Sequence, residues 1–202
     1  MKNLLTIAGS DCSGGAGIQA DLKTFAAHQT YGMSVITAVT AQNTQGVFAV
    51  QNVNTDIIAR QIDAIFSDIH VDAVKIGMLS NKEVISVVAE TLRLFLPKII
   101  VLDPVMVSKS GYHLLEGDAY QFLIKKLFPL TYFLTPNIPE AEIICDMKIF
   151  DKDTMQIAAK KIFEMGTKNV LLKGGHLQNS ADDLLFDGKN FKWFCGVKIS
   201  NK

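Results

Sequence analysis

The chain has 202 residues, of which 49% are hydrophobic, so it can bury one sizeable core and is not intrinsically disordered. Its 20 basic and 20 acidic residues balance, which excludes the general electrostatic attraction typical of nucleic-acid-binding and anionic-membrane-binding proteins. No apolar run approaches the roughly 18 residues of a membrane span, and the 3 cysteines are scattered without metal-ligand spacing. We therefore expect a cytoplasmic protein with free thiols, in which residues 1–202 form a single domain.

The first half of the chain alternates apolar runs with helical patterns. Residues 4–8 predict a strand that leads into a glycine-rich segment at residues 9–17, and a helix follows to about Gln29. The β-branched run at residues 34–40 predicts a second strand, whereas residues 46–53 look extended but outside the main sheet. The pattern then predicts a helix at residues 56–69, a strand at 73–77, a helix at 81–95 and a strand at 98–102.

The second half continues this alternation. After a loop at residues 108–111, helices and strands are predicted in turn at residues 117–127, 132–135, 139–144, 154–165 and 169–172. Runs at residues 183–186 and 191–194, separated by Asp187-Gly188, predict a closing hairpin. Short apolar strands that alternate with helices are typical of an α/β protein whose largely parallel sheet is covered on both faces.

Polar residues and glycines follow the predicted strands at the point where each strand ends. Because the carboxyl ends of parallel strands share one edge of the sheet, six such segments are expected to meet at one crevice. They supply carboxylates, a lysine, side-chain amides and glycine turns, which suit a phosphate, a divalent cation and a small polar ligand. The segments are Gly9-Ser10-Asp11, Gln42-Asn43, Gly77-Met78, Asp103, Asn137 with Glu140, and Lys173-Gly174-Gly175.

Three charged residues of this set each have two interpretations. Asp103 and Glu140 are candidate Mg²⁺ ligands, because hard cations take oxygen ligands. Asp103 could instead cap the following turn, and Glu140 could serve a first helical turn, where acidic residues are favoured. Lys173 could bring its charge and the following glycine amides to phosphates, or could be a solvated lysine before a turn.

The glycine-rich segment has two familiar interpretations besides a general ligand loop. A P-loop is excluded, because no G-x-x-x-x-G-K-[ST] pattern is present in the chain. Residues 15–20 match the G-x-G-x-x-A dinucleotide fingerprint, which requires an acidic residue at the end of the second strand. That strand ends at Thr40-Ala41-Gln42 without an acidic residue, so the sequence argues against an NAD(P)-dependent oxidoreductase.

Seven segments, spread in order over nearly the whole chain, form a specific combination. They are residues 6–11, 13–24, 41–44, 75–79, 103–106, 135–142 and 173–176. In this combination the chain resembles the hydroxymethylpyrimidine/phosphomethylpyrimidine kinase family of the ribokinase-like superfamily. The resemblance implies a ribokinase-like three-layer α/β/α fold with a mainly parallel central sheet.

The resemblance also implies an activity and a role for each site residue. The implied reaction is the ATP- and Mg²⁺-dependent phosphorylation of 4-amino-5-hydroxymethyl-2-methylpyrimidine, and then of its monophosphate, in thiamine biosynthesis. By family position, the residues around the pyrimidine are Gly9, Ala16, Gln42 and Met78, with Asp21 toward the hydroxyl. The residues implied at the nucleotide are Asp103, Asn137, Glu140 and Lys173, of which Asp103 and Glu140 would hold Mg²⁺.

The family also carries a Gly-Thr-Gly-Cys segment, which opens a later helix and supplies catalytic groups. The resemblance places this segment beyond Lys202, so we expect the domain to be incomplete at its C-terminal end. Two alternatives stay open, a pyridoxal kinase and a catalytically inactive pyrimidine-binding protein, although Ala41-Gln42-Asn43-Thr44 favours an aminopyrimidine. The resemblance further implies a homodimer with a small-molecule substrate, while the balanced charge and the lack of a long apolar run predict no nucleic-acid or membrane partner.

Overall fold

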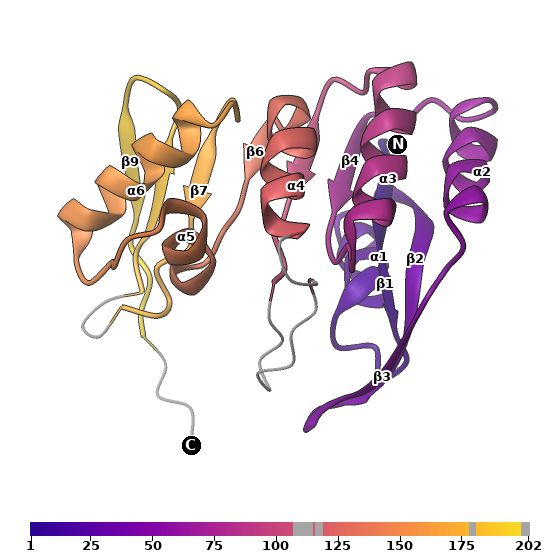
Figure 1. The fold of residues 1–202 in the computed structure, drawn as a ribbon, viewed down its shortest axis with the longest axis horizontal. Helices are drawn as coiled ribbons and strands as arrows, with labels where there is room; N and C mark the ends of the chain where they lie inside the picture. The colour runs from indigo at the N-terminus through magenta and orange to yellow at the C-terminus, as the bar shows by residue number, and fades with distance from the viewer. Residues whose placement is uncertain (107–114, 116–118, 178–180, 199–202) are drawn as a thin grey trace.

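The computed structural model describes residues 1–106, 115, 119–177 and 181–198 (Figure 1). Its strands are β1 (Asn3–Asp11), β2 (Tyr31–Asn43), β3 (Gly46–Asn52), β4 (Ala73–Ile76), β5 (Ile100–Leu102), β6 (Phe133–Leu134), β7 (Val170–Leu172), β8 (Asp183–Phe186) and β9 (Phe191–Phe194). Its α-helices are α1 (Gly17–Ala27), α2 (Thr55–Phe66), α3 (Lys82–Phe95), α4 (Ala119–Leu127), α5 (Ile138–Cys145) and α6 (Lys152–Glu164). The predicted loop at residues 108–111 lies outside the described residues.

One nine-stranded sheet runs through the described chain in the order β3-β2-β1-β4-β5-β6-β7-β8-β9. The six strands from β2 to β7 in this order pair in parallel, whereas β3, β8 and β9 pair antiparallel with their neighbours. The predicted mainly parallel α/β sheet and its closing hairpin are therefore confirmed. The parallel order also brings the carboxyl ends of these strands to one edge, as the sequence predicted.

Residues 46–53 are extended as predicted, but their predicted place outside the main sheet was wrong, because β3 is the edge strand of that sheet. It pairs with β2 from Ala38↔Asn52 to Asn43↔Gly46. In Figure 1 the two strands form a ribbon that reaches past the neighbouring strand ends. None of the β3 residues is fully buried, so β3 lacks the apolar face that identifies a strand in a sequence.

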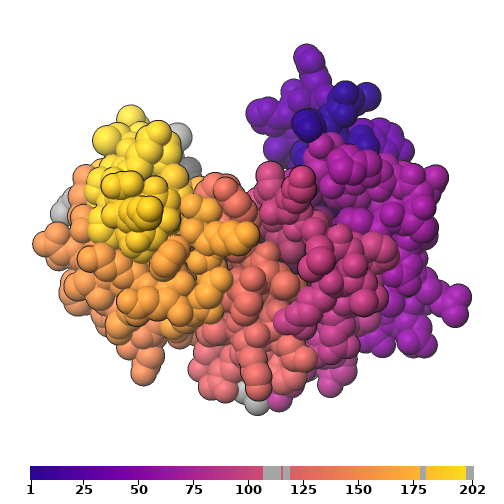
Figure 2. All heavy atoms as spheres, turned by 90° about the horizontal axis from the view of Figure 1, so that it is seen from above, coloured from indigo at the N-terminus to yellow at the C-terminus, as the bar shows by residue number. Residues whose placement is uncertain are grey.

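The two faces of the sheet carry different helices. Thr6 of β1 donates a hydrogen bond to Asp21 of α1, while its neighbours Leu5 and Ile7 point to the opposite face and join the core that includes Ile58 of α2. In Figure 1, α2 to α6 lie together on that face and α1 lies behind the sheet. Figure 2 shows a hollow between the indigo N-terminal part and the yellow β8–β9 hairpin. Cover on both faces, which the sequence predicted, is found only in part within the described ranges.

Local sequence signals explain where these helices begin. The Asn54 side chain caps α2, Asn81 caps α3, and Asp151 caps α6, each by accepting a backbone amide of the first turn. Helix α3 then buries an apolar stripe that includes Val84, Val88 and Leu92. None of the helices in the described part of the chain has the length and apolar character needed to cross a membrane.

Candidate functional site

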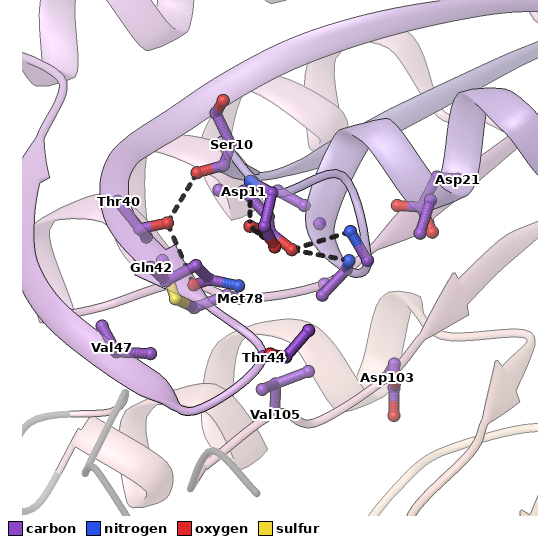
Figure 3. Close-up of a pocket in the computed structure, with 18 of the residues that line it drawn as sticks. Ser10, Asp11, Asp21, Thr40, Gln42, Thr44, Val47, Met78, Asp103 and Val105 are labelled. Atoms are coloured by element: carbon purple, nitrogen blue, oxygen red, sulfur yellow. Dashed lines mark hydrogen bonds between the residues drawn. The ribbon is translucent and has the colours of Figure 1, made fainter. Parts of the chain in front are cut away.

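The carboxyl-end edge of the sheet contains a cavity of about 670 Å³ (Figure 3). Residues from the ends of β1, β2, β4 and β5, together with the start of α5 and the residue after β7, line it. All nine site residues that the sequence predicted lie in its wall, namely Gly9, Ala16, Asp21, Gln42, Met78, Asp103, Asn137, Glu140 and Lys173. The tertiary structure thus brings together residues that are up to 164 positions apart in the chain, from Gly9 to Lys173.

The glycine-rich segment is held by the carboxylate of Asp11. One oxygen of Asp11 accepts hydrogen bonds from the amide and hydroxyl of Ser13, both at 2.8 Å. The other accepts from the amides of Gly15 at 3.0 Å and Ala16 at 2.8 Å (Figure 3). Backbone amides that converge in this way commonly bind a phosphate, but here an internal anion already occupies them. The segment therefore forms a cavity wall and does not offer these amides to a phosphate.

Close packing of the backbone places this wall against β1. Gly17 has φ +55°, and a Cβ there would overlap the carbonyl oxygen of Gly9. At Gly9 a Cβ would lie 2.6 Å from the methyl carbon of Met78. Glycine is thus needed at position 17 for the approach of α1 to β1, whereas at position 9 the flexible end of Met78 would have to move aside.

Gln42 is fixed at both its side chain and its backbone. The hydroxyl of Thr40 lies 3.0 Å from Gln42 Oε1 and 2.9 Å from the carbonyl oxygen of Ser10 (Figure 3). The Cys12 thiol donates to the Gln42 carbonyl oxygen at 3.1 Å, and the Gln42 amide donates to the sulfur at 3.5 Å. The side-chain amide, which can both donate and accept, is therefore held at the cavity wall.

Asp21 is engaged in a half-buried ion pair in the wall of the cavity. One carboxylate oxygen accepts from Lys75 Nζ at 2.9 Å and from the Thr6 hydroxyl at 2.6 Å. Lys75 lies on β4 and also lines the cavity. These contacts fix the orientation of Asp21 and compensate its charge.

The residues for which the resemblance implies a place at the nucleotide form a second charged group. Lys173 Nζ donates to Asp103 Oδ1 at 2.9 Å. Asn137 and Glu140 form a capping box, in which the Asn137 side chain accepts from the Glu140 amide and the Glu140 side chain accepts from the Asn137 amide, both at 2.8 Å. Glu140 thus has the structural role that the sequence left open, and it still borders the cavity.

Burial of Glu140, which is only 6% exposed, raises the pKa of its carboxyl to about 7. The Asn137 amide and Lys173 oppose this increase, whereas the nearby Asp103 carboxylate adds to it. A bound cation would favour the ionised form of Glu140, because its positive charge would compensate the lost solvation of the carboxylate and weaken the repulsion by Asp103.

The donor set could hold a Mg²⁺ ion whose remaining ligands are waters and phosphate oxygens. Among the described residues, no group of three or more His, Cys, Asp and Glu side chains is placed to hold a metal alone. Mg²⁺, however, needs only one or two protein carboxylates when waters and substrate phosphates complete its shell. Asp103 and Glu140 satisfy that requirement on one edge of the cavity.

The turn after Lys173 differs from the expectation that both glycine amides are available to phosphates. The Gly174 amide donates to Asp183 Oδ1 at 2.8 Å. A Cβ on Gly174 would overlap the backbone of Asp182, whereas a Cβ on Gly175 would meet nothing within 4 Å. Gly174 therefore anchors the turn to the start of β8, and of these three residues only Lys173 lines the cavity.

Thr40 and Lys75 are among the wall residues to which sequence reasoning assigned no role. Thr40 lies two positions before Gln42 on the same strand, so both side chains share one face. Lys75 is a charged residue inside the apolar run 73–76, and such a residue usually has a specific partner. Both signals were visible in the sequence, but neither identifies a partner.

Comparison with known proteins adds independent information. The model of the phosphomethylpyrimidine kinase family matches residues 11–202. The hydroxymethylpyrimidine/phosphomethylpyrimidine kinase of Aquifex aeolicus is 47% identical over 199 residues, which cover 98% of this chain and 78% of that protein. A thiamine biosynthesis bifunctional protein of Geobacter sulfurreducens is 49% identical over 201 residues. The matched region covers 99% of this chain but only 41% of that relative.

Solved structures agree with these relatives. The crystal structure of phosphomethylpyrimidine kinase from Clostridium difficile 630 has 56% identity and a TM-score of 0.92, covering 98% of this chain and 86% of that one. An ADP complex of Bacillus subtilis pyridoxal kinase has 38% identity and a TM-score of 0.89, covering 100% of this chain and 76% of that one. These matches confirm the ribokinase-like α/β fold. The chain belongs to the phosphomethylpyrimidine kinase family.

Proposed function

We propose that the cavity binds 4-amino-5-hydroxymethyl-2-methylpyrimidine, or its monophosphate, and that the enzyme phosphorylates it from ATP in thiamine biosynthesis. The observation that carries this proposal is the meeting of two chemically different groups in one cavity. Gln42 and Met78 form a wall suited to a small polar ring, and Asp103, Glu140 and Lys173 form a wall suited to phosphates. The family membership of the chain supports the same assignment.

The pyrimidine side offers shape and directional hydrogen bonds. Gly9 and Ala16 leave room for a flat ring beside Met78, because neither carries a large side chain. The Gln42 amide can pair with both the ring nitrogen and the amino group of an aminopyrimidine. We assign Asp21 to the hydroxymethyl side as an indirect contributor, because its carboxylate is already paired with Lys75.

The nucleotide side supplies charge and position, which are the main requirements of phosphoryl transfer. In the proposed step the substrate hydroxyl oxygen forms a bond to the γ-phosphorus and releases its proton to solvent, while the bond from that phosphorus to the β–γ bridging oxygen breaks and ADP leaves. Lys173 would stabilise negative charge on the phosphates, and Asn137 and Glu140 would border them. Mg²⁺ held by Asp103 and Glu140 would neutralise phosphate charge when bound.

The test combines calorimetry with an ADP-release assay on the purified chain. Binding of the hydroxymethylpyrimidine together with ATP-dependent ADP release is the expected result. Pyrimidine binding without ADP release would favour an inactive pyrimidine-binding protein. A faster turnover of pyridoxal than of the pyrimidine would favour a pyridoxal kinase, a possibility that the similarity to the Bacillus subtilis enzyme makes specific.

We further propose that residues 1–202 belong to a single domain of a cytoplasmic homodimer. The continuous nine-stranded sheet supports one domain. Light scattering coupled to size-exclusion chromatography tests the dimer, and a monomeric mass at micromolar concentration would contradict it.

A further inference from the structure

The segment between β1 and α1 has fixed ends and an exposed middle. At its start, Asp11 pairs with β2 and is only 3% exposed. At its other end, Gly17 lies so close to the Gly9 carbonyl oxygen that a Cβ would not fit. Between these ends, Gly15 and Ala16 are exposed, although both line the cavity. Packing against neighbours therefore does not fix the place of these two wall residues, and hydrogen bonds must do so.

The Asp11 carboxylate supplies these hydrogen bonds. Its Oδ2 accepts from the amides of Gly15 at 3.0 Å and Ala16 at 2.8 Å, and its Oδ1 accepts from the amide of Ser13 at 2.8 Å (Figure 3). Backbone amides only donate and an ionised carboxylate only accepts, so the direction of each bond is unambiguous. Within the described part of the chain, Asp11 is the one acceptor for the amides of Gly15 and Ala16.

The support of Asp11 is itself rigid. The Asp11 amide donates to Gln19 Oε1 at 2.8 Å, and Gln19 Nε2 donates to the Ser10 hydroxyl at 2.7 Å. Gln19 belongs to α1, so it ties the end of β1 to the helix that follows the exposed residues. Burial works to raise the pKa of Asp11, but hydrogen bonds, among them those of Ser13 and Ala16, outweigh that effect and lower it. The anchor is therefore a fixed anion at neutral pH.

We propose that Asp11 is a positioning residue that holds Gly15 and Ala16 as a preformed wall of the pyrimidine site. This inference rests on the proposed function, in which Ala16 borders the ring. The carboxylate takes the place that a bound anion has at converging backbone amides. A wall that is ordered before the ligand arrives also avoids the entropic cost of ordering it on binding. Loss of the carboxylate should therefore weaken pyrimidine binding, and a small carboxylate from solution should replace it.

The first test is chemical rescue, followed by calorimetry with 4-amino-5-hydroxymethyl-2-methylpyrimidine at constant ionic strength. Asp11→Ala should raise the dissociation constant by about ten-fold or more, because the wall must then be ordered on binding. Excess formate should reverse much of this loss, since its two oxygens replace those of the missing carboxylate. Formamide, which is neutral and has one acceptor atom, should not. An unchanged dissociation constant in Asp11→Ala, or a loss that formate leaves unaltered, would overturn the proposal.

A second test needs no pyrimidine. Hydrogen exchange of the Gly15 and Ala16 amides is measured by ¹⁵N–¹H NMR in the parent, in Asp11→Ala and in Asp11→Asn. Exchange should be slowest in the parent and fastest in Asp11→Ala, where formate should slow it again. Equal exchange in the parent and the variants would refute the anchoring role. Asp11→Asn keeps the shape of the side chain but only one acceptor oxygen, so it provides the comparison if the alanine variant does not fold.

The two tests separate this inference from the function on which it rests. If the parent does not bind the pyrimidine, the proposed function fails, and the exchange rates still decide whether Asp11 holds Gly15 and Ala16. Slow exchange in the parent that is lost in Asp11→Ala and recovered with formate would support the anchor by itself.

A matched control uses a carboxylate with similar bonds outside the cavity wall. Asp151 accepts hydrogen bonds from the amide of Thr154 at 2.9 Å and from its hydroxyl at 2.6 Å, and it does not line the cavity. Asp151→Ala should lower the melting temperature, because α6 loses its cap, while the pyrimidine dissociation constant stays at the parent value with or without formate. Weaker pyrimidine binding by Asp151→Ala would show that the readout reports stability and would count against the proposal.

Discussion

Glu140 makes the stability of this protein depend on pH in the direction opposite to that of most carboxylates. Burial raises the pKa of this group from 4.5 to about 7; the Asn137 amide and Lys173 oppose the increase, and the Asp103 carboxylate adds to it. In the unfolded chain the carboxyl ionises near its ordinary value. Between pH 4.5 and about 7, unfolding therefore releases a proton, and raising the pH favours the unfolded state.

The perturbation that isolates this effect is Glu140→Gln. A glutamine oxygen can still accept the Asn137 amide, so the capping box is retained. The interval from 4.5 to about 7, at 1.36 kcal/mol for each pH unit, corresponds to about 3 kcal/mol. The free energy of unfolding of the variant should thus exceed that of the parent by about 3 kcal/mol above pH 8, and the two should agree near pH 4.5.

The assay is urea denaturation followed by circular dichroism in metal-free buffer between pH 4.5 and 8.5. Glu142→Gln on the same helix is a control of opposite sign, because the Ile149 amide, ahead of Lys148, lowers the pKa of Glu142. That variant should be less stable than the parent by a nearly constant amount over this range, because the contribution of a carboxyl with a lowered pKa is lost only as the pH falls below its ordinary value of 4.5. A stability difference for Glu140→Gln that does not grow with pH would refute the reasoning.

Two further substitutions test the site. Gln42→Ala should weaken pyrimidine binding by about ten-fold to a hundred-fold, because it removes a donor and an acceptor that pair with the ring. The melting temperature should change little. Equal affinities of variant and parent in calorimetry would contradict the place of Gln42 at the ring. Gly174→Ala should lower the free energy of unfolding by about 1–3 kcal/mol, because its Cβ would overlap the Asp182 backbone. Gly175→Ala, which adds a Cβ in open space, should unfold like the parent in the same denaturation experiment, and equal losses in the two variants would contradict this account.

Much of the fold could be predicted because its signals are local. The hairpin at residues 183–186 and 191–194 has the predicted bounds, since an Asp-Gly turn between two short apolar runs has few alternatives. The prediction for β3 failed because that strand buries no apolar face, and its identity depends on pairing with β2. Pairing between strands is a tertiary property that composition does not report.

The candidate site also has a part that the sequence predicts and a part that only the folded structure shows. All nine predicted residues line the cavity. They could be predicted because the strand-end pattern and the family pattern both depend only on residue type and on position along the chain. Thr40 and Lys75 were missed, because their importance comes from the side chains they meet, Gln42 in one case and Asp21 in the other. A sequence states which groups are available but not which of them are already bonded to one another.

The glycine-rich segment illustrates this limit most clearly. Its sequence by itself determined a flexible turn between β1 and α1, and the chain as a whole determined the family and the edge of the sheet at which ligands bind. Only the tertiary structure decided that the Asp11 carboxylate takes the amides of Ser13, Gly15 and Ala16. The physical reason is that hydrogen-bond partners are chosen by distance and direction in the folded chain, and an amide already bonded to an internal anion is no longer offered to a ligand.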